Sequence, residues 1–260
     1  MLSMHPFSLV ICAAAWHNKK YMETVSKQQI LHDFTSWWRD EFAVAHKANT
    51  IKLSHLSQFT INPFLWSYLA YYLRGNSNAR SLAEALILPR ALGTSVNTIF
   101  GTRFQQFVVH YFQDAYGSTT PGVDIEFEDK IDHRKKYCQL KAGPNVVNND
   151  DIKTVVDHFD ALRRLARTNH VDVRDSDCIF GLLYGKPEEK SGVIKTIERS
   201  YPVYIGQEFW HHFTGDDTFY IDLIQAIGEI ANEFDLSEIV EETIVKLAQD
   251  IREKYPEITE

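Results

Sequence analysis

Apolar residues recur every three or four positions along most of the first hundred residues, which places them on one side of a helix. The longest run has its apolar positions at Val96, Ile99, Phe100, Phe107, Val108, Tyr111 and Phe112. Shorter runs predict three earlier helices. The first begins with a capping box at Ser26, the second begins at Asn62 and the third at Ser81. We expect Gly75 to end the second of these helices and Pro89 the third.

Two short segments further along show the alternating pattern of β-strands instead. In the first, Asp124 and Glu126 share one face, and the apolar residues around them take the other. In the second, Gln139 and Lys141 share a face for the same reason. The polar tract 128–135 suits the loop of a hairpin that joins the two strands.

A helix and another strand are expected after the hairpin. Asp150 or Asp151 can cap this helix, whose apolar side comprises Ile152, Val155, Val156, Phe159, Leu162 and Leu165. The apolar run 178–184 reads as a strand, and a strand–helix–strand unit forces a parallel pair with a right-handed crossover. The rest of the chain predicts a short strand at 203–205. Three helices follow it, at 207–213, from about Phe219 and from about Leu236. The pattern therefore predicts a mixed α/β fold.

The formal net charge is −8, but it is unevenly distributed along the chain. Residues 226–260 contain ten acidic and three basic residues, so they carry seven of the eight net negative charges. Basic residues cluster around the hairpin, at Lys130, Arg134, Lys135, Lys136 and Lys141. A local basic cleft is enough to contact phosphates. Arg163, Arg164 and Arg167 either add to this charge or complement the C-terminus of their own helix.

The cysteines and the N-terminal residues indicate in which cellular compartment the protein is expected. Cys12, Cys138 and Cys178 lack metal-ligand spacing, which favours buried free thiols in a reducing cytoplasm. The apolar run 7–15 resembles the middle of a signal peptide but lacks a preceding Lys or Arg, so it is either an extension packed on the body or a leader. No segment approaches the roughly twenty apolar residues that span a bilayer.

The hairpin also carries candidate chemistry. Asp124, Gln139 and Lys141 bring a carboxylate, an amide oxygen and an ammonium to the end of one strand pair. Metal-assisted phosphodiester cleavage needs oxygen ligands for Mg²⁺ and a lysine that steadies the attacking water or the developing charge. An exposed hairpin face that carries solvated charges has the same spacing, so the spacing alone leaves both interpretations open.

Longer motifs extend this pattern. The segments 124–127 (DIEF) and 138–145 (CQLKAGPN) resemble those of type II restriction endonucleases with the PD-(D/E)xK nuclease core. Shorter matches follow in the family's order over roughly residues 60–215, at 61–64, 87–90, 181–185 and 206–210. The resemblance implies a restriction-endonuclease-like core with a mixed central sheet flanked by helices. We expect a single domain 1–260, with a mainly helical N-terminal region 1–94, a catalytic core 95–215 and acidic C-terminal helices 216–260.

The resemblance implies catalytic roles for Asp124, Gln139 and Lys141, with Mg²⁺ as the cofactor. Asp124, Gln139 and the backbone carbonyl of Leu140 would bind the metal, and Lys141 would place the water and stabilise charge. Gln139 departs from the family pattern, which has Asp or Glu at this position. A neutral amide binds a hard cation more weakly than a carboxylate does. Glu126 is the nearest acid that could help, or else an exposed strand residue.

Residues near these motifs are candidates for contacts with DNA. Lys135 and Lys136 would contact phosphates, and Asn145 and Asn148 have amides that can read base edges. The resemblance favours a DNA-facing position for Asn145. Helix capping explains the polar end of this loop equally well.

The leading functional hypothesis is a type II restriction endonuclease that cuts double-stranded DNA at a palindromic site, which the resemblance implies is GC-rich. A palindrome implies a two-fold homodimer, and the class implies a cognate DNA methyltransferase as a functional partner in the cytoplasm, with no membrane association. Two alternatives stay open. One is a repair or mobile-element nuclease with the same core. The other is a non-catalytic DNA-binding protein with a decayed core, an interpretation motivated by Gln139.

Overall fold

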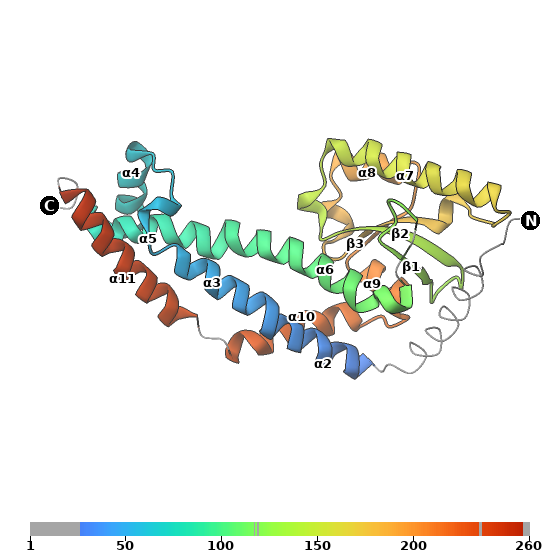
Figure 1. Cartoon of the computed structure of the whole chain (residues 1–260), viewed down its shortest axis with the longest axis horizontal. Helices are drawn as coiled ribbons and strands as arrows, with labels where there is room; N and C mark the ends of the chain where they lie inside the picture. Colours follow the sequence, from blue (N-terminus) through green and yellow to red (C-terminus); the bar gives the residue numbers. More distant parts are fainter. Residues whose placement is uncertain (1–26, 117, 119, 234–235, 257–260) are drawn as a thin grey trace, which may run out of the picture. The chain divides into compact units, whose positions relative to one another are not determined.

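The computed structural model describes residues 27–116, 118, 120–233 and 236–256. These residues form two compact units (Figure 1). Unit 1 combines the described residues up to Phe34 with Phe104–Ala226, and unit 2 combines Thr35–Arg103 with the described part of Ile227–Glu260. The apolar run 7–15, Cys12 and the cap expected at Ser26 lie outside the described residues.

A four-stranded mixed sheet forms the centre of unit 1, in the order β1-β2-β3-β4. Its strands are β1 (Ile125–Glu128), β2 (Lys135–Lys141), β3 (Cys178–Leu182) and β4 (Val203–Ile205). β1 pairs antiparallel with β2 across the hairpin, whereas β2 pairs parallel with β3, and β3 with β4. The predicted mixed α/β fold, the hairpin and the parallel crossover are confirmed.

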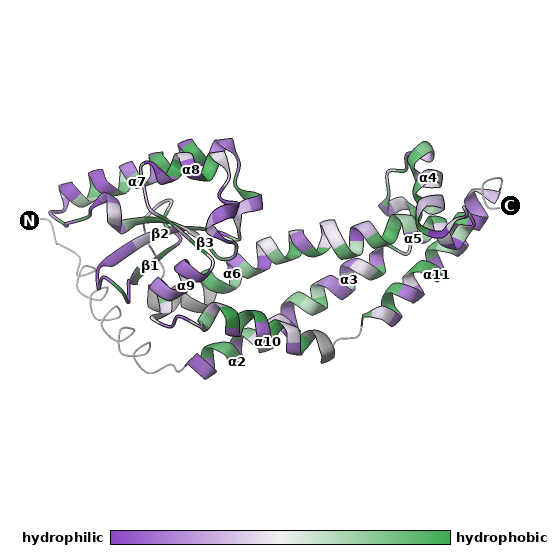
Figure 2. Cartoon of the chain, turned by 180° about the vertical axis from the view of Figure 1, so that it is seen from behind, coloured by the Kyte–Doolittle hydropathy of each residue, from purple (hydrophilic) through white to green (hydrophobic). Residues whose placement is uncertain are grey.

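One face of this sheet is covered by α7 (Asn149–Thr168) and α8 (Gly192–Glu198) (Figure 1). Hydrophobic and hydrophilic residues alternate along both helices (Figure 2), and the apolar side of α7 packs on the sheet through Val155, Phe159 and Leu162. Two details of the predicted helix are wrong. Leu165 is 49% exposed, because it lies beyond the side of α7 that faces the sheet. The N-cap is Asn148, not Asp150 or Asp151.

The other face of the sheet is covered by α9 (Gln207–Thr214) (Figure 1). Phe127 of β1 contacts Phe213 edge-on, with 5.0 Å between ring centroids. Trp210 is 1% exposed, and its ring nitrogen donates to the carbonyl of Leu183 at 2.8 Å. The two thiols in the strands, Cys138 and Cys178, are buried and free, as predicted. Packing on both faces therefore holds the strands of the hairpin in a fixed register.

Unit 2 is helical, and its core lies among α4 (Pro63–Arg74), α5 (Ala79–Pro89) and α11 (Ser237–Lys254). Asn62 caps α4 as predicted, and its side chain accepts the backbone NH of Phe64 at 3.1 Å. Gly75 ends α4 with a φ of 71°, a conformation that other residues rarely adopt.

The structure corrects both ends of the predicted third helix. α5 begins after Asn78, whose side chain accepts the NH of Ser81 at 3.0 Å, so Ser81 is inside the helix and not its cap. Pro89 does not end the helical path, because the chain continues directly into the π-helix η3 (Arg90–Ser95). A proline cannot donate the NH of an α-helical hydrogen bond, and a wider turn accommodates this loss.

The remaining helices are α2 (Lys27–Trp37), α3 (Val44–Lys52), α6 (Val96–Tyr116) and α10 (Phe219–Glu233). Short helical turns connect them and the strands: η1 (Trp38–Ala43), η2 (Leu56–Gln58), η4 (Pro144–Val146), η5 (Asp175–Asp177) and η6 (Pro187–Glu189). Among the described helices, none combines the length and the apolar character that crossing a membrane requires.

Candidate active site

Asp124, Gln139 and Lys141 lie at one end of the β1–β2 pair. Ile125 pairs with Cys138, so Asp124 and Gln139 are opposite each other one position further along. The NH of Asp124 donates to the carbonyl of Cys138 at 2.9 Å, which extends the ladder to this point. Gln139 and Lys141 are two residues apart in β2, so they share the sheet face that α7 covers.

The carboxylate of Asp124 is half-buried and accepts the backbone NH of Leu140 at 2.6 Å. Burial raises the pKa of this carboxyl above its ordinary value. The hydrogen bond from Leu140 and the neighbouring side chains of Lys141 and His158 offset part of that effect on the pKa. Asp124 therefore lies within electrostatic reach of the side chains of Lys141 and His158.

The backbone of Leu140 faces Asp124. Its NH donates to the Asp124 side chain, while the carbonyl of the next residue, Lys141, accepts the NH of Leu183 at 3.1 Å on the opposite side of β2. In a strand, the NH and the carbonyl of one residue point to the same side. The carbonyl of Leu140 therefore faces the edge where the Asp124 carboxylate lies.

Gln139 is 9% exposed, and its side-chain oxygen lies 3.4 Å from Nδ1 of His158 on α7. The His158 ring lies directly against Gly122, where a Cβ would overlap the ring. Gly122 also has a φ of 83°. Glycine is therefore required at this position both by the lack of space for a Cβ and by the left-handed backbone conformation. His158 was not singled out in the sequence, although it lies three residues after Val155 on the side of α7 that packs on the sheet.

Lys141 forms an ion pair with Asp151, with 3.0 Å between Nζ and Oδ1. Asp151 is 7% exposed, and its Oδ2 accepts the backbone NH of Asn148 at 2.9 Å. Sequence reasoning treated Asp151 only as a possible cap. The available signal was spacing, because Asp151, Val155 and His158 lie four and seven residues apart, on one side of a helix.

Glu126 points its carboxylate to other partners. One oxygen accepts the hydroxyl of Ser118 at 2.6 Å, and the other pairs with Nζ of Lys135 at 2.5 Å. Asp124 and Glu126 are thus on the same side of β1 but have different partners. Asp151, rather than Glu126, is the acid that contacts the proposed catalytic lysine.

Lys136 does not fit its predicted contact with DNA. Its side chain is 1% exposed, and Nζ lies 2.6 Å from Asp132 and 3.6 Å from Asp177. Nζ also donates to the carbonyl of Ser176 at 3.1 Å. Because β2 pairs with β3, this lysine lies against the residues that precede β3, and its charge compensates the buried carboxylate of Asp177.

The other predicted DNA contacts are accessible. Lys135 has a side chain that is 59% exposed, and Asn145 lies exposed in η4. Asn148 is also exposed, and its side-chain oxygen accepts the NH of Asp150 at 2.8 Å as the cap of α7. Capping therefore accounts for Asn148 without DNA, whereas Lys135 is exposed but pairs with Glu126, and Asn145 is exposed.

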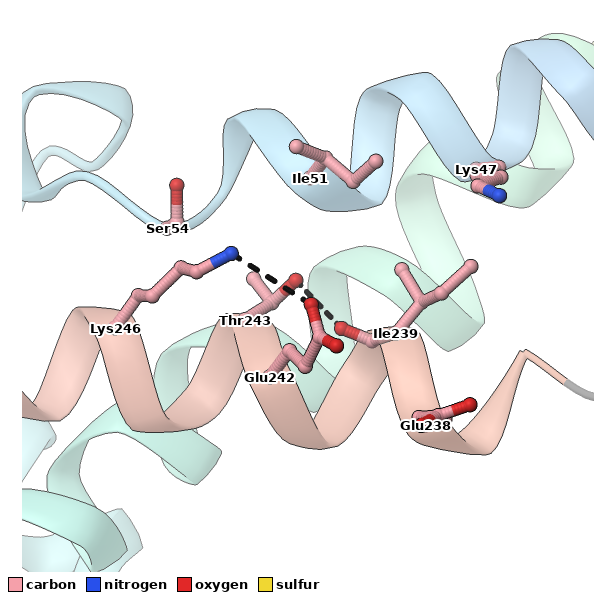
Figure 3. A pocket seen from close by; sticks show the side chains of 8 residues that line it. All are labelled: Lys47, Ile51, Ser54, Glu238, Ile239, Glu242, Thr243 and Lys246. Atoms are coloured by element: carbon pink, nitrogen blue, oxygen red, sulfur yellow. Dashed lines mark hydrogen bonds and ion pairs between the residues drawn. The ribbon is translucent and has the colours of Figure 1, made fainter.

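Unit 2 contains a pocket of about 440 Å³ between α3 and α11 (Figure 3). Its lining residues are Lys47, Ile51, Ser54, Glu238, Ile239, Glu242, Thr243 and Lys246. Glu242 and Lys246 pair across one turn of α11 at 3.6 Å. None of the predicted catalytic residues lines this pocket.

The atoms that could bind a metal ion at the candidate site are oxygens: those of the Asp124 carboxylate, the Gln139 amide and the Leu140 carbonyl. Among the described residues, no group of three or more His, Cys, Asp and Glu side chains is arranged to hold a metal ion. A cation here would therefore depend on amide and backbone oxygens as well as on Asp124. Such donors suit hard divalent cations.

The chain matches a model of a known protein family. Residues 45–235 match the family model described as Type II restriction endonuclease EcoO109I. The matched range spans most of the chain and contains every residue of the candidate site. A search of curated proteins found no match.

Proposed function

The chain belongs to the type II restriction endonuclease family, and from this premise we propose a Mg²⁺-dependent enzyme that cuts palindromic, GC-rich sites. The family consists of type II site-specific deoxyribonucleases, and DNA is the substrate. The observation that carries the proposal is the meeting of Asp124, Gln139 and Lys141 at one end of the β1–β2 pair. We also propose that residues 95–215, which hold all three, are the catalytic core.

Three oxygens would hold the metal: the Asp124 carboxylate, the Gln139 amide oxygen and the Leu140 carbonyl. When bound, Mg²⁺ would polarise a phosphoryl oxygen and make water a better nucleophile. The amide of Gln139 lacks the charge of the acid usual in the family, so we expect weaker metal binding than with a carboxylate. His158 lies beside this amide and would help to orient it.

Lys141 would act on the phosphate. Its ammonium can stabilise the charge that develops on the phosphoryl oxygens as water attacks in line. The attack would leave a 5′-phosphate and a 3′-hydroxyl. Lys135 and Asn145 are exposed and could contact the duplex, and Asn148 is a further candidate because it is exposed and its cap uses the side-chain oxygen.

Cleavage of plasmid DNA tests this function. The purified full-length chain is expected to cut plasmids into discrete fragments in Mg²⁺ and to leave them intact in EDTA. Sequencing the fragment ends should give one palindromic, GC-rich site with a constant stagger. Smeared products or a preference for branched substrates would favour the repair or mobile-element alternative. Specific binding without cutting would favour a decayed core, the alternative that Gln139 motivates.

We propose that the enzyme works as a homodimer, because a two-fold site requires one active site for each strand. Its genome would need a cognate methyltransferase to protect the same sites. α4 supplies a surface for a second copy, since its exposed apolar residues cover most of the helix: Phe64, Leu65, Tyr68, Leu69, Tyr71, Tyr72 and Leu73. Apolar patches of this kind mark interaction sites.

Charged substitutions in α4 should separate the two copies. Phe64 is 87% exposed and Tyr72 is 76% exposed, so Phe64→Asp with Tyr72→Asp should leave the fold intact. We expect the dimer Kd to rise at least about a hundredfold, since buried aromatic anchors each contribute about 2 kcal/mol or more. Analytical ultracentrifugation measures the shift. Leu92→Asp is the matched control, because Leu92 is 66% exposed in unit 2 but outside α4. Unchanged dimerisation of the α4 variant would exclude this surface.

A further inference from the structure

We propose that Asp151 is a positioning residue of the catalytic site. It holds the ammonium of Lys141 away from Asp124, and so leaves the Asp124 carboxylate available to a divalent cation. The inference rests on the proposed function and adds a residue at the N-terminus of α7 to the site.

The geometry of Asp151 supports this role. Its two oxygens have different partners: Oδ2 accepts the NH of Asn148 at 2.9 Å, and Oδ1 lies 3.0 Å from Nζ of Lys141. The cap requires only one of these oxygens. The second oxygen is directed to the sheet, and the Asp151 side chain is only 10% exposed. The carboxylate is therefore fixed by the helix terminus while it holds the lysine.

Two carboxylates compete for the single ammonium of Lys141. Within the part of the chain that the structure describes, Nζ is in ion-pair distance of Asp151 and not of Asp124. Lys141 and Asp124 nevertheless lie at the same end of the β1–β2 pair, and the charge of the lysine lowers the pKa of Asp124. Without the negative charge of Asp151, the lysine would be drawn to Asp124, where it would compete directly with a cation. This competition matters more here because Gln139 contributes no charge.

The test is Asp151→Asn, which keeps an oxygen for the NH of Asn148 and removes the charge. Mn²⁺ binding, followed by electron paramagnetic resonance on the full-length chain, is expected to weaken about tenfold, a change typical of residues that support a metal site. Cleavage kcat should fall by a similar factor, with the KM for DNA nearly unchanged. Asp151→Glu should restore part of both. Asp150→Asn is the matched control, because Asp150 is exposed in the same turn.

A double-mutant cycle shows whether Asp151 acts through Lys141. In the Lys141→Ala background, where no ammonium can occupy Asp124, Asp151→Asn should change Mn²⁺ binding by less than about twofold. An equal loss of Mn²⁺ binding in both backgrounds, or none in either, would overturn the inference. If instead Asp124→Asn cleaves DNA at the rate of the unmodified enzyme, the proposed catalytic site itself fails.

Discussion

Replacing Asp124 with asparagine is expected to slow DNA cleavage at least about a thousandfold while specific DNA binding persists. The substitution removes the charged oxygen among the three proposed metal ligands. A bound metal contributes several kcal/mol to the stability of the transition state, and about 1.4 kcal/mol corresponds to a factor of ten in rate. Single-turnover cleavage of a labelled duplex in Mg²⁺, with binding measured separately in Ca²⁺, checks the prediction.

The same variant should melt no lower than the unmodified chain. Burial raises the pKa of Asp124, which means that the ionised carboxylate is less favourable in the folded chain than in the unfolded one. A carboxyl with a raised folded pKa destabilises the fold at any pH above that pKa, and asparagine removes this cost. Its amide oxygen can still accept the NH of Leu140. Loss of folding in Asp124→Asn would mark Asp124 as a structural residue.

Replacing Lys141 with alanine is expected to slow cleavage about a hundredfold to a thousandfold, the usual effect of removing one donor that stabilises a developing oxyanion. It should also lower stability, because Asp151 loses its ammonium partner. Breaking a fully buried pair costs about 3–5 kcal/mol. The Lys141 side chain is 28% exposed, so the loss of stability should be smaller than that. Quenched-flow cleavage and thermal melting measure the two effects.

Two further variants separate these effects. Lys141→Ala combined with Asp151→Asn should recover stability without recovering cleavage, since no buried charge is left without a partner. Lys153→Ala serves as the control, because Lys153 is exposed on the same helix as Asp151. Cleavage by Lys141→Ala at the rate of the Lys153→Ala control would exclude a catalytic role for Lys141.

Much of the fold could be predicted from local patterns. Period-two alternation identified β1 and β2, and helical spacing identified α6 and α7. The errors lie at helix ends. α5 starts at an earlier cap than Ser81, and Pro89 is followed by a π-helix. These details depend on which polar side chain reaches a free backbone NH, and several neighbouring residues can do so.

The candidate site was only partly accessible from the sequence. Strand alternation put Asp124, Gln139 and Lys141 on one face, because the period of two holds within any regular strand. The same logic could not show that Lys136 is buried, since its partner Asp177 comes from the segment just before β3. It also left Glu126 as the nearest acid, although Asp151 is the residue that contacts Lys141.

By itself, the sequence determined the strands, the hairpin, the helical runs and the family, because these depend on residues within a few positions of each other or on short motifs. Only the tertiary structure decided which groups contact Lys141, the proposed catalytic lysine, and that Lys136 is enclosed. The contacts of Asp151 with Lys141 and of His158 with Gln139 arise where α7 packs on the sheet. Their distances are set by that packing, and no local pattern encodes them.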